Sequence, residues 1–287
     1  MKTARIAQLV AVICLSFSMS AEARSRSRSV SSDPGGHTSK GVAAAKSKNY
    51  DTAVAEFTKA IEAQPKDAKN YKNRGLVYKL TGKLKEAETD FSKAIELEPK
   101  DADALAGRGQ IFLQQKQMDK AIADFDAALK LEPKDIAARR LRAYAFIEKS
   151  DWDKAIADYS EIIKSKSDDA QALERRGFAY RNLKKYDEAI ADFTTIIEKA
   201  PKDPEAYRRR SYVYALTKQN EKAANDLKTI LKLRPDDADA QKRLKALPAQ
   251  TPASPAPSAT PKMSPALARP PVAPAKATPP ASPAPTR

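Results

Sequence analysis

Side chains that could carry out chemistry are scarce in this sequence, apart from its carboxylates. It contains one histidine, His37, and one cysteine, Cys14. The usual zinc clusters and Cys–His nucleophile pairs need more such residues, so the composition argues against both. Aspartates recur in IADFD, IADYS and IADFT, at residues 122–126, 156–160 and 190–194. Paired carboxylates can serve as general acid and base, but aspartates repeated at a fixed spacing are more typical of a solvated helix face.

The glycines support the same conclusion about catalysis. They stand mainly singly, at positions suited to turns or close packing, and form no phosphate-binding loop. We therefore predict that the protein is not an enzyme and that it has no catalytic residues, no metal site and no cofactor.

A fixed period organises the chain. The pentapeptide LEPKD occurs at residues 97–101 and again at 131–135, 34 positions later. The same phase divides the chain into six blocks without an insertion, which indicates one structural unit copied along the sequence. The blocks are residues 34–67, 68–101, 102–135, 136–169, 170–203 and 204–237, and each ends in aspartate.

Each block has the pattern of a helical hairpin. In residues 68–101, Tyr71, Gly75 and Tyr78 lie on one face of a first helix, and apolar residues recur every three or four positions in the second half. Pro99 ends the second helix, and Asp101 is placed to cap the next one. The eighth and twentieth positions of every block hold nothing larger than serine, which predicts that the two helices approach closely there.

These residues resemble the tetratricopeptide repeat family over residues 34–237. In the fifth block its pattern is matched by Leu173, Gly177, Tyr180, Tyr186, Ala189, Phe193 and Pro201. The resemblance implies an all-α fold, a right-handed superhelical solenoid of six hairpins whose first helices line the concave side. Two departures stand out. Arginine replaces the family's leucine in five blocks, and in the first block His37, Lys40 and Ala44 stand where large apolar residues are expected, which predicts a frayed or shortened first helix.

The two ends of the chain differ from the repeats. Residues 1–23 have a basic start, an apolar stretch and an Ala-Glu-Ala site, which predicts a cleaved signal peptide, although the arginines of RSRSRS just beyond it would favour retention in the cytoplasm. Residues 24–37 are predicted to be a linker, residues 38–247 the solenoid with a capping helix at 238–247, and residues 248–287, rich in proline and alanine, a disordered tail. No membrane span is predicted after signal cleavage.

The distribution of charge argues against nucleic acid as the partner. The chain has a net charge of +15, but within residues 34–237 the excess is only six positive charges, with 40 basic and 34 acidic side chains. Nucleic-acid binders usually concentrate basic charge on one face of the folded domain. Much of the excess here lies in the terminal segments.

A surface for a protein partner is expected on the first helices of the last three blocks. Their ninth positions hold aromatic residues, and arginines stand around them, the residue types enriched at binding hot spots. The family's chain-end carboxylate clamp needs asparagine at the ninth position, and no block has it there. The predicted partner-binding residues are Arg140, Tyr144, Glu174, Arg175, Phe178, Arg181, Arg208, Arg209 and Tyr212.

Three functional hypotheses follow from the sequence. The leading one is an exported scaffold, periplasmic or secreted from a bacterial envelope, that binds a partner peptide or helix in its concave groove. The alternatives are an RNA-binding helical-repeat protein and a non-catalytic subunit of an envelope complex. Packing of the same aromatic residues between adjacent repeats is the competing explanation for the groove.

Overall fold

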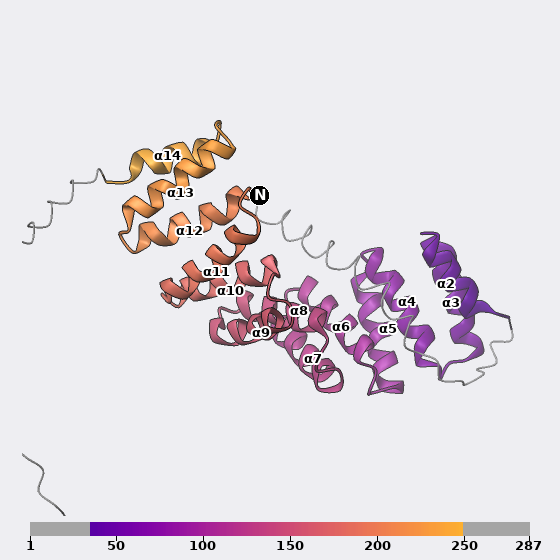
Figure 1. The fold of residues 1–287 in the computed structure, drawn as a ribbon. Helices are drawn as coiled ribbons and strands as arrows, with labels where there is room; N and C mark the ends of the chain where they lie inside the picture. The colour runs from indigo at the N-terminus through magenta and orange to yellow at the C-terminus, as the bar shows by residue number, and fades with distance from the viewer. Residues whose placement is uncertain (1–34, 249–287) are drawn as a thin grey trace, which may run out of the picture. The chain divides into compact units, whose positions relative to one another are not determined.

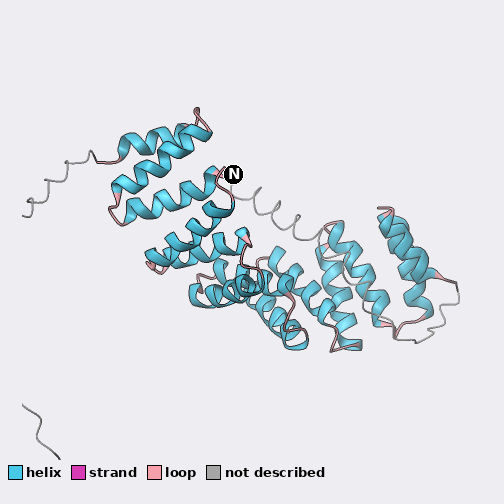
Figure 2. Cartoon of the chain, viewed as in Figure 1, coloured by secondary structure: helices cyan, strands magenta, loops and turns pink. Residues whose placement is uncertain are grey.

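A computed structural model describes residues 35–248 of the protein. The predicted signal peptide, all but the last residues of the predicted linker, and nearly all of the predicted tail lie outside the described residues. Over residues 35–248 the chain consists of helices joined by short loops, with no strand (Figures 1 and 2).

Within residues 35–248 the helices form six hairpins followed by one more helix, and each helix packs against the next in the chain. The all-α solenoid of six hairpins with a capping helix is thus confirmed. The helices are α2 (His37–Lys46), α3 (Tyr50–Ala63), α4 (Ala68–Leu80), α5 (Leu84–Leu97), α6 (Ala102–Gln114), α7 (Met118–Leu131), α8 (Ile136–Glu148), α9 (Trp152–Ser165), α10 (Ala170–Asn182), α11 (Tyr186–Lys199), α12 (Pro204–Leu216), α13 (Asn220–Leu233) and α14 (Ala238–Ala246).

The aspartate that ends each block starts the next helix, as the sequence predicts. Its carboxylate accepts a hydrogen bond from a free backbone N–H in the first turn, which satisfies a donor that the helix itself leaves unpaired. Asp101, for example, accepts from the N–H of Ala104 at 2.9 Å. The capping residues are Asp67, Asp101, Asp135, Asp169, Asp203 and Asp237.

Small residues let the two helices of a hairpin meet. A Cβ added to Gly109 would lie 2.9 Å from the ring of Phe125, and one added to Gly177 would lie 2.9 Å from the ring of Phe193. Both phenylalanines are buried. Each aromatic ring of the second helix therefore fills space that a side chain on the first helix would otherwise occupy.

The turn inside each hairpin repeats one backbone conformation. The fifteenth residue of every block has a positive φ, 76° at Gly82 and 59° to 62° at the others. Only Gly82 avoids the steric penalty that a Cβ brings in this region. The other five residues are Lys48, Lys116, Ser150, Lys184 and Lys218.

The two ends of the array differ from its middle. Helix α2 has 10 residues where the other first helices have 13, which confirms the expected shortening. At the other end α14 buries Ala240 and packs Leu244 and Leu247 against the last hairpin, as a capping helix does. None of the described helices is both long enough and apolar enough to cross a bilayer.

The first helices form one side of the array. Among the described helices, successive first helices (α2 with α4, α4 with α6, and α6 with α8) contact each other more than any two successive second helices do. This is the arrangement expected when the first helices lie on the inner side of a curved stack. We call the side formed by the first helices the inner face.

Candidate protein-binding surface

A row of ion pairs runs between the helices from the second repeat to the sixth. In each, an arginine on the first helix donates two hydrogen bonds to an aspartate 16 residues later on the second helix; Arg176 Nε and Nη2 bond Asp192 at 2.9 and 2.6 Å. We call this row the arginine–aspartate ladder. Its pairs are Arg74–Asp90, Arg108–Asp124, Arg142–Asp158, Arg176–Asp192 and Arg210–Asp226.

The ladder also joins neighbouring repeats. The remaining nitrogen of each arginine donates to a side chain on the second helix of the preceding repeat, as Arg176 Nη1 does to Ser160 Oγ at 3.1 Å. The acceptors in the preceding repeats are Thr58, Ser92, Asp126, Ser160 and Thr194. Each guanidinium of the ladder therefore links three helices: its own, the second helix of its repeat and the second helix of the preceding repeat. These links fix the angle between successive hairpins.

The ladder corrects the expectation that the recurring aspartates face solvent. Asp124, Asp158 and Asp192 are only 6%, 4% and 4% exposed, and the prediction of a solvated face is wrong. A buried carboxylate is tolerated because a guanidinium neutralises it and satisfies its oxygens. The hydrogen bonds that Arg176 donates to Asp192 raise the pKa of Arg176, so this arginine keeps its charge. The sequence contains a signal for this pairing, because the five blocks with arginine at the family's leucine position are the same five blocks that have the aspartate.

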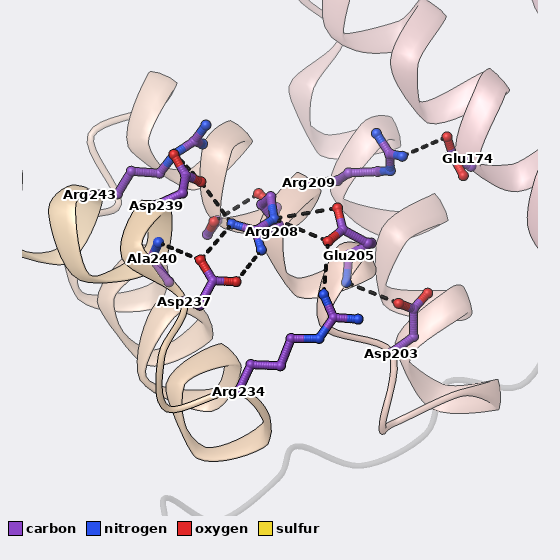
Figure 3. Close-up of polar contacts among 11 residues, drawn as sticks. Glu174, Asp203, Glu205, Arg208, Arg209, Arg234, Asp237, Asp239, Ala240 and Arg243 are labelled. Carbon is purple, nitrogen blue, oxygen red and sulfur yellow. Dashed lines mark hydrogen bonds and ion pairs between the residues drawn. The ribbon is translucent and has the colours of Figure 1, made fainter. Parts of the chain in front are cut away.

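Two of the predicted binding residues, Arg140 and Arg208, hold the next repeat in place. Arg140 Nη2 lies 2.6 Å from Asp169, and Arg208 Nη2 lies 2.5 Å from Asp237, both of which are N-caps. Arg208 also reaches Asp239 at 2.7 Å, so α14 is tied to α12 (Figure 3).

The pKa values of the capping carboxylates follow from these contacts. Hydrogen bonds from Arg208 and from the Ala240 N–H lower the pKa of Asp237 to about 2. Burial acts to raise the pKa of Asp169, but hydrogen bonds from Arg140 and the Ala172 N–H outweigh it and the pKa is lowered. Both carboxylates are therefore charged at neutral pH and compensate their arginines.

A third predicted arginine, Arg209, is paired as well. It points away from the contacts around Arg208 and toward α10, where its Nη2 lies 2.8 Å from Glu174 (Figure 3). Glu174 and Arg209 thus form one contact between the fifth and sixth repeats, partly exposed on both sides. The two side chains that the sequence analysis grouped as ligand contacts bind each other in the structure.

Among the remaining predicted residues, Arg181 lies between the aromatic rings of Phe178 and Tyr212. The guanidinium carbon of Arg181 lies 4.6 Å from the ring centre of Phe178 and 5.2 Å from that of Tyr212 on the next first helix. Arg243 of α14 lies 5.8 Å from the same Tyr212 ring. We define the arginine–aromatic stripe as Tyr144, Arg175, Phe178, Arg181, Tyr212 and Arg243.

Tyr144 and Arg175 make up the other end of the stripe. Burial raises the pKa of Tyr144 to about 12, Glu148 adds to this, and the charge of Arg175 opposes it. Arg175 is therefore close enough to Tyr144 to act on it electrostatically. Within residues 35–248, neither Arg175 nor Arg181 forms an ion pair or a side-chain hydrogen bond. Both side chains are partly exposed.

Two residues that the sequence analysis did not select contribute to the stripe. Trp152, at the start of α9, meets the ring of Phe178 edge to face at 5.8 Å, so Phe178 serves partly as packing between repeats. Arg243 extends the stripe onto the capping helix. Its position on the polar side of residues 238–247 was the signal in the sequence. Of the three aromatic residues Tyr144, Phe178 and Tyr212, Tyr212 is the most exposed, at 41%.

Comparison with known proteins agrees with this architecture. Models of the tetratricopeptide repeat match residues 36–67, 72–136, 140–204 and 180–247. The chain therefore belongs to the tetratricopeptide repeat family. No curated protein sequence matches it significantly.

Several solved structures share the fold. YrrB, described as "a TPR protein with an unusual peptide-binding site", is 24% identical, with a TM-score of 0.60, and the match covers 66% of this chain and 97% of that one. MamA is 22% identical, with a TM-score of 0.56 and coverages of 60% and 93%. PilF of Pseudomonas aeruginosa is 14% identical, with a TM-score of 0.57 and coverages of 74% and 96%. At these identities the likeness concerns the fold alone.

Proposed function

We propose that this protein is an exported interaction scaffold that binds a segment of a partner protein on the inner face of its last three repeats. The observation that carries the proposal is the arginine–aromatic stripe. It offers exposed ring surface and two arginines that no carboxylate of the described chain neutralises, and both residue types are enriched at binding hot spots.

The rest of the structure supplies a rigid support for that stripe. The ion pairs of Arg140 and Arg208 join α8 to α10 and α12 to α14, and the arginine–aspartate ladder joins first helices to the second helices of their own and the preceding repeat. A surface held in one geometry loses little conformational entropy when a partner binds, which favours affinity. YrrB, which has the same fold and is described as having a peptide-binding site, is consistent with this proposal.

Binding is tested by affinity purification from the native host with the wild type, with a Tyr212→Ala/Arg181→Ala variant and with Leu233→Ala as a matched control. Leu233 is 37% exposed, close to the 41% of Tyr212, and lies on the second helix of the same repeat. The proposal predicts proteins that the wild type and the control retain and the double variant loses. Retention of the same proteins by all three would contradict it.

Export is proposed from residues 1–23, and sequencing of the mature N-terminus tests it. A chain beginning at Arg24 in an envelope or secreted fraction is expected, since Ala21-Glu22-Ala23 fits a cleavage site. An intact Met1 in the cytosol would remove this part of the proposal and strengthen the RNA-binding alternative. The salt dependence of binding to an RNA would then test that alternative, because phosphate contacts give a steep slope.

A further inference from the structure

We propose that the arginine–aromatic stripe receives an extended acidic segment, in which two carboxylate side chains bind Arg175 and Arg181. This inference rests on the proposed function and specifies the chemistry of the partner. It differs from capture of a chain end, because the two receptors are separate arginines on one helix and need two carboxylates.

The first argument is the distribution of charge on the inner face. Arg140 is neutralised by Asp169, Arg208 by Asp237 and Asp239, and Arg209 by Glu174. Arg243 shares Asp239 with Arg208. Arg175 and Arg181 are the arginines of the stripe that lack such a partner in the described chain. A ligand with two carboxylates would neutralise Arg175 and Arg181, just as carboxylates of the chain itself neutralise the neighbouring arginines.

The second argument is the geometry of Arg181. Its guanidinium lies over the rings of Phe178 and Tyr212, which leaves the N–H edges as its free hydrogen-bonding groups. A planar guanidinium edge matches the two oxygens of a carboxylate. The adjacent rings exclude water on one side, and a lower local dielectric strengthens the pairing with an anion.

The spacing of the two arginines sets the spacing of the acidic residues. Arg175 and Arg181 are six positions apart on α10, which places them about 9 Å apart along the helix axis and about 120° apart around it. A ligand that binds both arginines must therefore cross α10 obliquely. An extended chain advances about 3.3 Å per residue, so acidic residues roughly three to five positions apart would reach both.

The exposed surface beside Arg181 adds an apolar requirement. Tyr212 and Leu216, one turn apart on α12, are 41% and 45% exposed. An apolar side chain of the ligand placed between or beside its acidic residues would cover them. We therefore infer a segment in which acidic residues alternate with a few aliphatic or aromatic ones.

The stripe fits such a peptide better than a single-stranded nucleic acid. Bases are held by stacking on aromatic faces, whereas Arg181 and Arg243 already lie over the Tyr212 ring and Arg181 lies over Phe178. The repeats also carry 34 acidic side chains against 40 basic ones, a balance that gives little general attraction for a phosphate backbone.

The experiment measures binding of fluorescein-labelled peptides of about 12 residues by anisotropy, using the full mature chain. The acidic peptide contains Asp, Glu, Leu and Gly and is blocked at both ends; a matched peptide carries Asn and Gln instead, and a labelled oligothymidylate carries equal negative charge. We expect Arg175→Gln and Arg181→Gln each to weaken binding of the acidic peptide about tenfold. Arg234→Gln, which removes an exposed arginine of the sixth repeat, should change it less than twofold.

Several results would overturn the inference. One is that the acidic peptide does not bind, or that the neutral peptide binds equally well. Another is that the oligothymidylate binds more tightly than the acidic peptide and loses its binding in Arg175→Gln and Arg181→Gln. The last is that Arg175→Gln, Arg181→Gln and Arg234→Gln weaken binding of the acidic peptide equally. Far-UV circular dichroism confirms that each variant is folded. If a natural partner is lost with the Tyr212→Ala/Arg181→Ala variant while the acidic peptide fails to compete for it, the proposed function stands and this inference fails.

Discussion

The arginine–aspartate ladder predicts strong coupling between the two members of each pair. Arg176 and Asp192 make two hydrogen bonds, and their side chains are 20% and 6% exposed. Replacing either residue by leucine leaves an uncompensated charge with little access to water. Removing one partner of a buried pair costs about 3–5 kcal/mol, and the partial exposure of Arg176 places the cost near the lower figure, about 3 kcal/mol.

Replacing both residues removes the stranded charge. An apolar pair of similar volume is often no less stable than a buried ion pair, so Arg176→Leu/Asp192→Leu should cost no more than either single change. The coupling free energy in this double-mutant cycle is then about 3 kcal/mol.

Urea unfolding measures these free energies. Far-UV circular dichroism follows the whole array, and fluorescence follows Trp152, the only tryptophan, which contacts the fifth repeat through Phe178. Glu198→Ala changes an exposed carboxylate on the same helix as Asp192 and should alter stability by less than about 0.5 kcal/mol. A cost below about 1 kcal/mol for the single changes, with no coupling, would refute the stabilising role of the ladder.

Three further predictions concern local features of the fold. Lys116→Gly, at a φ of 61°, should raise the free energy of unfolding by about 0.5–1 kcal/mol, and Gly82→Ala should lower it by about 1 kcal/mol; opposite signs in urea titrations would contradict the steric argument. Gly177→Ala places a Cβ 2.9 Å from the Phe193 ring and should cost about 1–3 kcal/mol, so an unchanged melting temperature would show that the helices separate at no cost. The pKa of Asp237 is lowered to about 2 from 3.8, so its ion pair stabilises the fold above pH 3.8 and this contribution is lost as the pH falls toward 2. The stability difference between the wild type and Asp237→Asn should therefore shrink over that window, and a constant difference would show that the carboxylate does not titrate there.

The features of the fold that the sequence predicted are those set by the residue type at one position or by residues a few positions apart. The helix ends follow from Pro99 and Asp101 and their equivalents, because capping depends on residues a few positions apart. The close approach at Gly109 and Gly177 follows from residue size alone. The aspartates of the ladder were wrongly expected to face solvent, because their burial depends on an arginine 16 residues earlier in the same block, on the other helix of the hairpin.

The contacts of the candidate surface depend on neighbouring repeats. Glu174 and Arg175 are adjacent, yet a rotation of about 100° between successive residues of a helix turns them toward different repeats. Glu174 meets Arg209 of the next repeat, and Arg175 acts on Tyr144 of the preceding one. The sequence therefore identified the residue types on the inner face, but the contacts between repeats decide which arginines are neutralised.

Photo-crosslinking from the inner face tests the central claim most directly. A benzoylphenylalanine replaces Tyr212, at 41% exposure on the first helix of the sixth repeat, or Leu233, at 37% on its second helix, in the full chain expressed in its native host. If the inner face binds the partner, position 212 gives adducts of defined mass and position 233 does not. Equal adducts from both positions, or adducts from position 233 alone, would contradict the assignment of the inner face.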